Sequence, residues 1–458
     1  MKKGAAIFSA ICKSRTCSLL KSCKTHAGSI AAYRFFDNPR VTEEALISQL
    51  QDYCKQRVGG REILALCDSS AINISSQYNR IVDAAGLGPI EQTPYHTTLG
   101  FLIHPVLAID KADNTVYGIG SVDIWNRAQT PRRSRKFRYE SQKDPIEVKE
   151  SMKWIRPCEQ SMEQTFSTAK HVTFVMDREG DLIEVFDRLP NEKVDLVVRC
   201  RHNRLICDQS NKTKKLFDWV AVQKVKATRF ITIQKGHPKR KARAVKMEIK
   251  YGQFKMPWPK KKATLYRNHP KGINTYYVQI KQQHANGYED ESPIEWLLLT
   301  TKKVQSIEQA LDVISIYEKR WQIEVYFKHL KSDGFDIEPT QLTKGKSIRK
   351  LILMIMQAAL KVEQLKAARD GQGDIRVDEV FDPKEIECLK AINKEVSGAT
   401  KIQQNPYPEQ HLSWASWIIA RLGGWTGYNK RRPPGTKTFI YGLQQFEAMF
   451  IGYKLKGD

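Results

Sequence analysis

Residues 63–67 read Ile63-Leu64-Ala65-Leu66-Cys67, and Asp68 follows them directly. A short continuous apolar run with charged neighbours on both sides indicates a buried strand. Residues 172–176, which read Val172-Thr173-Phe174-Val175-Met176, have the same character and also precede an acid, Asp177. An open α/β sheet places its functional site at the C-terminal ends of such strands. The two runs therefore predict an α/β core whose site includes Asp68 and Asp177.

The segments on either side of these runs predict the remaining organisation. Residues 98–108 and 115–125 predict two more strands, with Asp113-Asn114 as the turn between them. A long helix is expected from Ser306 past Lys331, and residues 151–169 also have a helical pattern. The expected domains are an N-terminal helical region at 1–60, a core at 61–204 and 301–345, a β-rich insertion at 205–300, and a C-terminal helical region at 346–458.

The charge of the chain indicates an anionic partner. The 458 residues include 75 Lys and Arg against 50 Asp and Glu, a formal net charge of +25. Nucleic acid is the favoured partner. A membrane is not expected, because the longest apolar stretch, near Leu351 to Leu360, has only about half the length that crosses a bilayer. Without a visible secretory signal or a Cys-x2-Cys pair, the sequence predicts a cytoplasmic protein without structural zinc.

The most informative stretch is 317–331. At about 100° per residue, Tyr317, Arg320, Glu324 and Lys331 share about 60° of a helical face. Such a row has two readings. It is either a solvated charged face with i,i+4 pairing, or a carboxylate metal ligand beside groups that bind phosphate.

These four residues resemble a known signature. Their spacing is Tyr, two residues, Arg, three residues, Glu, six residues, Lys. The spacing resembles the Tyr-Arg-Glu-Lys signature of bacterial cut-and-paste insertion-sequence transposases with a DDE triad, and Asp68 and Asp177 resemble the first two acids of that triad. Ala32-Tyr33-Arg34-Phe35 with Asn38-Pro39 resembles the family's N-terminal DNA-binding region, and residues 419–424 resemble its C-terminal region. The likeness therefore extends over nearly the whole chain.

The resemblance implies a fold and a chemistry. The expected fold class is α/β, with a ribonuclease-H-like mixed-sheet core, a β-rich insertion and flanking helical regions. Asp68, Asp177 and Glu324 are expected to be catalytic and to hold two Mg2+ ions, which Mn2+ can replace. Hard oxygen ligands select such ions, and a pair of them suits phosphodiester cleavage. The C-terminal region is expected to form a homodimer in the synaptic complex.

The resemblance also implies the contacts with double-stranded DNA, both at the transposon ends and at the target. Arg320 and Lys331 are expected to hold terminal phosphates, Tyr317 to donate a hydrogen bond to one, and Lys328 to join them. Trp296 matches a tryptophan that stacks on a flipped base, with a core tryptophan as the alternative. Arg199 aligns with a basic residue near the transposon end. Trp321 is expected to lie in the core or on the surface rather than on DNA.

The expected function is a DNA transposase that cleaves at transposon ends, through a hairpin intermediate in this family, and joins the 3′ ends to a target. Two other functions remain open: an inactive, N-terminally shortened protein that binds DNA or dimerises, and a nuclease without strand transfer. The segment ahead of Ala32 looks short for the family. Ser69-Ser70 stands where threonines are expected, and Gly180 stands where a larger residue is expected.

Overall fold

The computed structural model describes residues 2–14, 16–23, 25–92, 97–127, 144–233, 243–259, 272–283, 293–332, 334–427 and 433–456. Its strands join in one thirteen-stranded mixed sheet, in the order β2-β4-β1-β6-β7-β13-β12-β11-β8-β9, with β10 on β11 and with β3 and β5 on β4. Two apolar clusters cover the two faces of its central strands. The predicted α/β class is therefore confirmed.

The central strands carry the site. They are β1 (Glu62–Cys67), β2 (Ser70–Asn73), β3 (Gly88–Gln92), β4 (Thr97–Asp110), β5 (Val116–Trp125), β6 (His171–Met176) and β7 (Val194–Arg199). β1, β6 and β7 are parallel to one another, whereas β4 is antiparallel to β1 and β5 is antiparallel to β4. This is the mixed sheet expected of a ribonuclease-H-like core.

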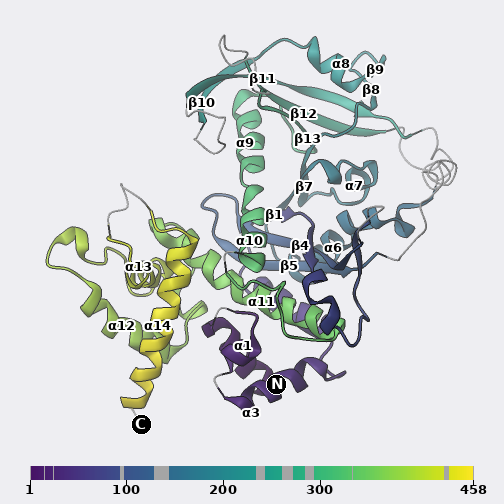
Figure 1. The fold of residues 1–458 in the computed structure, drawn as a ribbon. Coiled ribbons are helices and arrows are strands. Elements are labelled where there is room, and N and C mark those ends of the chain that lie inside the picture. The colour runs from purple at the N-terminus through teal and green to yellow at the C-terminus, as the bar shows by residue number, and fades with distance from the viewer. Residues whose placement is uncertain are drawn as a thin grey trace.

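The sheet continues without a break into the β-rich part at the top of Figure 1. β13 pairs antiparallel with β7, so the segment expected to be an insertion extends the core sheet. Its elements are β8 (Leu205–Cys207), β9 (Thr213–Lys215), α8 (Leu216–Ala221), β10 (Ala227–Ile233), β11 (Arg243–Met256), β12 (Ile273–Gln282) and β13 (Glu295–Thr300).

Helices dominate the two ends of the chain, as the sequence predicts. The N-terminal helices are α1 (Lys2–Ser14), α2 (Leu19–Ser22), α3 (His26–Asp37) and α4 (Glu43–Lys55). The C-terminal ones are α11 (Gly345–Ala367), α12 (Pro383–Val396), α13 (Leu412–Leu422) and α14 (Thr436–Lys456). In Figure 1, α12, α13 and α14 form a group beside the rest of the molecule, and α11 joins this group to the core. No described helix is long and apolar enough to cross a membrane.

Two predicted helices are interrupted. The helix expected over 306–331 consists of α9 (Ile307–Glu318) and α10 (Trp321–Lys331). At the junction, the N–H groups of Lys319 and Arg320 bond to carbonyls three residues earlier, which tightens the turn. Residues 151–169 form a 3-10 turn, α6 (Arg156–Gln160) and a π turn. Pro157 stands in the first turn of α6, where proline is tolerated, and not in a helix interior.

Candidate active site

Asp68 lies where a strand is interrupted. β1 and β2 pair with the same edge of β4, and only Asp68 and Ser69 separate them. The register of the two pairings places Asp68 opposite Pro105 and Ser69 opposite His104. Proline has no N–H to donate to a neighbouring strand. The ladder therefore breaks at Asp68, and its carboxylate stands at the C-terminal end of a buried strand.

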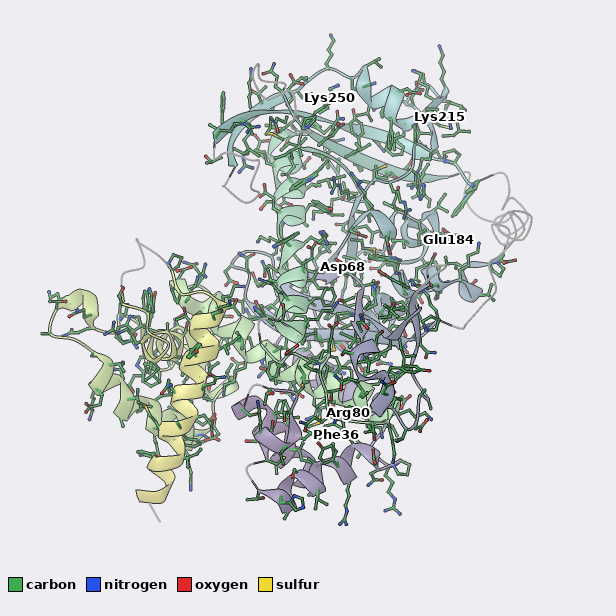
Figure 2. The ribbon with its side chains drawn as sticks, in the orientation of Figure 1. Phe36, Asp68, Arg80, Glu184, Lys215 and Lys250 are labelled. Atoms are coloured by element: carbon green, nitrogen blue, oxygen red, sulfur yellow. The ribbon has the colours of Figure 1, made fainter. Side chains whose placement is uncertain are left out.

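Strand alternation directs the two aspartates to the same face of the sheet. Leu66 and Val175 belong to the apolar cluster that includes the buried residues of α9 and α10. Asp68 and Asp177 each stand two residues later, and successive side chains of a strand alternate between faces. Both carboxylates are therefore expected on the side that α10 covers. Figure 2 labels Asp68 near the middle of the molecule, between the β-rich part and the helical base.

Arg320 links two of the predicted acids. Its Nη1 donates to Asp68 Oδ2 at 2.9 Å, and its Nη2 donates to Glu324 Oε1. The side chain of Arg320 is 13 % exposed, so both ion pairs are shielded from solvent. Asp68 and Arg320 are 252 residues apart in the sequence. The fold therefore brings the first acid of the expected triad to the helix that carries the third.

Asp177, the second acid of the expected triad, is also close enough for its charge to act on Asp68. Burial raises the pKa of Asp68 to about 6, and the charge of Asp177 adds to this rise. The Ser69 N–H bond and the charge of Arg320 lower the pKa, while Glu324 raises it. The pKa of Asp68 thus depends on the charges of both other acids, so the three acids lie close together. Such a shift in a cluster of acids is typical of functional sites.

A 3-10 turn of residues 178–180 follows Asp177 and fixes the second acid. Asp177 Oδ1 accepts the N–H of Glu179 at 2.8 Å. Gly180 is buried, and a Cβ there would stand 2.7 Å from Met176 Cβ. A larger residue at position 180 would need Met176 to move, which accounts physically for glycine where the sequence comparison expected a larger residue.

Asp181 has a structural role. Its Oδ2 accepts the N–H groups of Arg201 and His202 at 2.7 Å and 3.0 Å, and Oδ1 pairs with Arg204. Asp181 therefore fixes the loop after β7. It is not part of the cluster of Asp68, Asp177 and Glu324. Asp181 lies before the next helix, α7 (Ile183–Arg188), which begins two residues later.

Tyr317 connects Arg320 to the β-rich part of the sheet. It packs edge-to-face on Trp296, with ring centroids 5.1 Å apart. Burial raises the pKa of Tyr317, and interactions with Arg320 and Arg199 offset part of the rise. Arg199 Nη2 also donates to the carbonyl of Glu295 at 3.2 Å. The predicted residues Arg199, Trp296, Tyr317 and Arg320 therefore form one connected group.

The cations of α10 differ in exposure. Lys331 is half-buried, and burial lowers its pKa, with a partial offset from Glu338. Lys328 is exposed on the same helix, one turn after Glu324. Trp321 is 62 % exposed at the first turn of α10, directly after Arg320. It is a surface residue, as the sequence allowed.

His329 has a structural role. It is buried, its Nε2 lies 2.9 Å from Thr436 Oγ1, and its Nδ1 pairs with Glu363. These contacts join α10 to α11 and α14. The helix that carries Glu324 is thereby fastened to the C-terminal region.

The donor set fits a hard divalent cation. Asp68, Asp177 and Glu324 offer only carboxylate oxygens, the ligands that Mg2+ and Mn2+ prefer. Within the described ranges, no three Asp, Glu, His or Cys residues are gathered closely enough to hold an ion in their present positions. At this site, the guanidinium of Arg320 stands between the carboxylates of Asp68 and Glu324 and keeps them apart. The side chain of Arg320 therefore neutralises part of the negative charge that a metal ion would otherwise neutralise.

The sequence interpretation missed His104, a buried polar residue beside the site. Its Nδ1 lies 2.8 Å from Ser69 Oγ, next to Asp68. The available signal was a histidine inside the apolar run Leu102-Ile103-His104-Pro105-Val106. A polar residue within such a run must find a partner when the strand is buried.

Residues 154–360 match a family model described as "Transposase DDE domain". The matched range begins before β6 and ends within α11, so it includes Asp177, Glu324 and the residues of the Tyr-Arg-Glu-Lys spacing. Asp68 precedes the matched range and is connected to it by the ion pair with Arg320.

Proposed function

We propose a specific function from the match of residues 154–360 to the transposase DDE domain, a kind of domain that cleaves DNA and transfers DNA strands. The chain is a bacterial cut-and-paste insertion-sequence transposase with the Tyr-Arg-Glu-Lys signature. It cleaves at the ends of its element, with a hairpin intermediate, and joins the 3′ ends to target DNA.

One observation carries this proposal: a single arginine binds two of three acids that come from distant parts of the chain. Arg320 bonds to Asp68 and Glu324, and the charge of Asp177 raises the pKa of Asp68. A solvated charged face would not bury its arginine against a carboxylate from another strand. The proximity supports a shared catalytic role for the three acids.

We assign the metal ligands to Asp68, Asp177 and Glu324. Two bound Mg2+ or Mn2+ ions would supply the chemistry that activates the attacking oxygen and stabilises the leaving oxygen. The acids hold their negative charge in a partly buried place, so a divalent cation relieves both their mutual repulsion and their loss of hydration.

The remaining residues of α9 and α10 bind and orient DNA in this proposal. Arg320 and Lys331 hold phosphates, Lys328 adds a charge at the surface, and the Tyr317 hydroxyl donates a hydrogen bond. The half-buried indole of Trp296, which packs against Tyr317, stacks on a flipped base. Arg199 joins this group through its interaction with Tyr317.

The regions on either side have separate tasks in the proposal. Residues 1–60 contact DNA, and the C-terminal region pairs two copies in the synaptic complex. The α14 helix supports pairing, because its exposed positions between 441 and 453 have no charge: Tyr441, Gln444, Gln445, Ala448, Met449, Gly452 and Tyr453. Two copies of a chain with a net charge of +25 repel each other, so an uncharged face suits their contact.

The test is Glu324→Gln, which keeps the size of the side chain and removes its charge. We expect Mg2+-dependent cleavage of a DNA end to be lost and DNA binding to be retained. Glu318→Gln, the same change at an exposed residue at the end of α9, serves as the matched control for charge removal. Persistent cleavage in Glu324→Gln would refute the assignment of the acids. Cleavage by the unmodified chain without joining of 3′ ends would favour a nuclease, and binding without cleavage would favour an inactive DNA-binding protein.

A further inference from the structure

His104 of β4 is fully buried and contacts the loop that carries Asp68. Its side chain belongs to the second face of the sheet, where it packs edge-to-face on Trp154 with ring centroids 4.6 Å apart. Nδ1 lies 2.8 Å from Ser69 Oγ. The imidazole therefore reaches the site from the side opposite α10.

A histidine is a costly residue at this position. Its Nε2 has no hydrogen-bond partner among the described residues, although the atom is buried. An unpaired buried polar atom destabilises the folded protein, because it has lost its hydrogen bonds to water and gained none. An apolar side chain would fill the space beside Trp154 without that cost. The bond to Ser69 is the feature that an apolar residue cannot provide.

Ser69 connects His104 to the carboxylate of Asp68. Its N–H donates to Asp68 Oδ1 at 2.7 Å, while Arg320 binds Oδ2 at 2.9 Å. The two carboxylate oxygens are thus held from opposite sides. Since Pro105 stands opposite Asp68 and cannot donate to it, the side-chain bond between His104 and Ser69 replaces support that a strand ladder would give.

The imidazole is uncharged under working conditions. Burial, together with the nearby charge of Lys153, lowers the pKa of His104 to about 3. Lys153 is itself nearly buried and pairs with Glu179 at 3.1 Å. A neutral imidazole shares one proton with the Ser69 hydroxyl and adds no charge to the site. Its contribution is therefore geometric.

We propose that His104 is a positioning residue that holds the Asp68 carboxylate in place through Ser69. The inference rests on the proposed function, in which Asp68 is a metal ligand. Partners that orient metal ligands typically contribute about 10-fold to 100-fold in metal affinity. Because the two residues act as one unit, losing either should have the same effect as losing both.

The experiment measures the Mn2+ concentration that gives half of the metal-induced rise in melting temperature, in the full chain without DNA. The variants are His104→Phe, Ser69→Ala, their combination, and Ser69→Thr, which keeps the hydroxyl. We expect each single removal to raise the Mn2+ midpoint about 10-fold or more, the double variant to equal the worse single variant, and Ser69→Thr to match the unmodified chain. Ser69→Ala changes only one hydroxyl group, so it tests the inference even if His104→Phe does not fold.

Two results would overturn the inference alone. One is a midpoint unchanged by Ser69→Ala or by folded His104→Phe. The other is a double variant whose effect is the product of the two single effects, because His104 would then act independently of Ser69. Asp68→Asn distinguishes these results from a failure of the proposed function. If the unmodified chain and Asp68→Asn respond equally to Mn2+, Asp68 is no ligand, and the proposed function fails together with the inference.

Discussion

Asp68 should make metal binding sensitive to pH in a range where ordinary carboxyls are not. Burial and the charge of Asp177 raise its pKa to about 6. Below that pH the carboxyl is protonated, and a cation must displace the proton before it binds. The apparent Mn2+ affinity should therefore fall about 10-fold between pH ~8 and pH ~5. A carboxyl with a pKa near ~4 would be ionised throughout this range, and the affinity would hardly change.

The same shift affects the stability of the metal-free protein, with a definite sign. A carboxyl whose pKa is higher in the folded state favours folding in its protonated form. The protein therefore loses stability as the pH rises from about 4 through about 6, by up to ~3 kcal/mol for this shift. Asp68→Asn stays neutral and avoids that loss. Without metal, this variant should be the more stable of the two at pH ~8, and the difference should shrink toward pH ~4.

Thermal melting with and without Mn2+ measures both effects, and calorimetry at two pH values gives the affinity directly. An apparent Mn2+ affinity that changes less than about twofold between pH ~5 and pH ~8 would show that Asp68 does not exchange a proton for the metal in this range. Metal-free Asp68→Asn that is less stable than the unmodified chain at pH ~8 would contradict the raised pKa, because the buried charge would then not be costly.

Two further changes test the surfaces beside the site and on α14. Trp321→Ala should leave both the melting temperature and the affinity for a DNA end nearly unchanged, since the indole is 62 % exposed and is not expected to contact DNA; a loss of about 1–3 kcal/mol of binding in a titration would show instead that a base stacks on it. Met449→Glu adds a charge to the exposed face of α14 and should reduce pairing of two DNA ends in a gel assay while cleavage of single ends persists. The matched control is Lys437→Glu, at an exposed position of the same helix. Undiminished pairing in Met449→Glu would contradict a dimer contact at Met449.

The sheet could be predicted from the sequence because its central strands are short apolar runs that end in acids. Burial on both faces requires such runs, and periodicity reveals them. The strands over 98–108 and 115–125 and the cap of α4 by Thr42 were also predictable, since local residue types determine turns and caps. The continuous helix expected from Ser306 was wrong at Lys319 and Arg320. No proline or glycine marks that junction, and the side chain of Lys319 bonds there to the carbonyl of Lys111.

The contacts within the site depend on tertiary structure and could not be read from spacing. A helical wheel places Arg320 near Glu324 but contains nothing about Asp68, which lies 252 residues away. The depth at which a carboxyl is buried sets its pKa, and no local pattern gives that depth. His104 was similarly hidden, because its importance depends on Pro105 and on which residue of the neighbouring strand it faces.

Arg320 takes part in both proposed binding functions, that of metal and that of DNA. It is the cation that bonds to Asp68 and Glu324, and it is also the residue proposed to hold a DNA phosphate. A guanidinium paired with two carboxylates attracts a phosphate only weakly, because the two acids neutralise its charge and repel the phosphate. Arg320 can turn to DNA at low cost only when another cation neutralises the acids, because a buried carboxylate without a partner is strongly unfavourable. The two binding events therefore support each other, since each favours the arrangement in which Arg320 has left the acids. Such linkage would keep the acids paired, and the protein stable, until both DNA and metal are present.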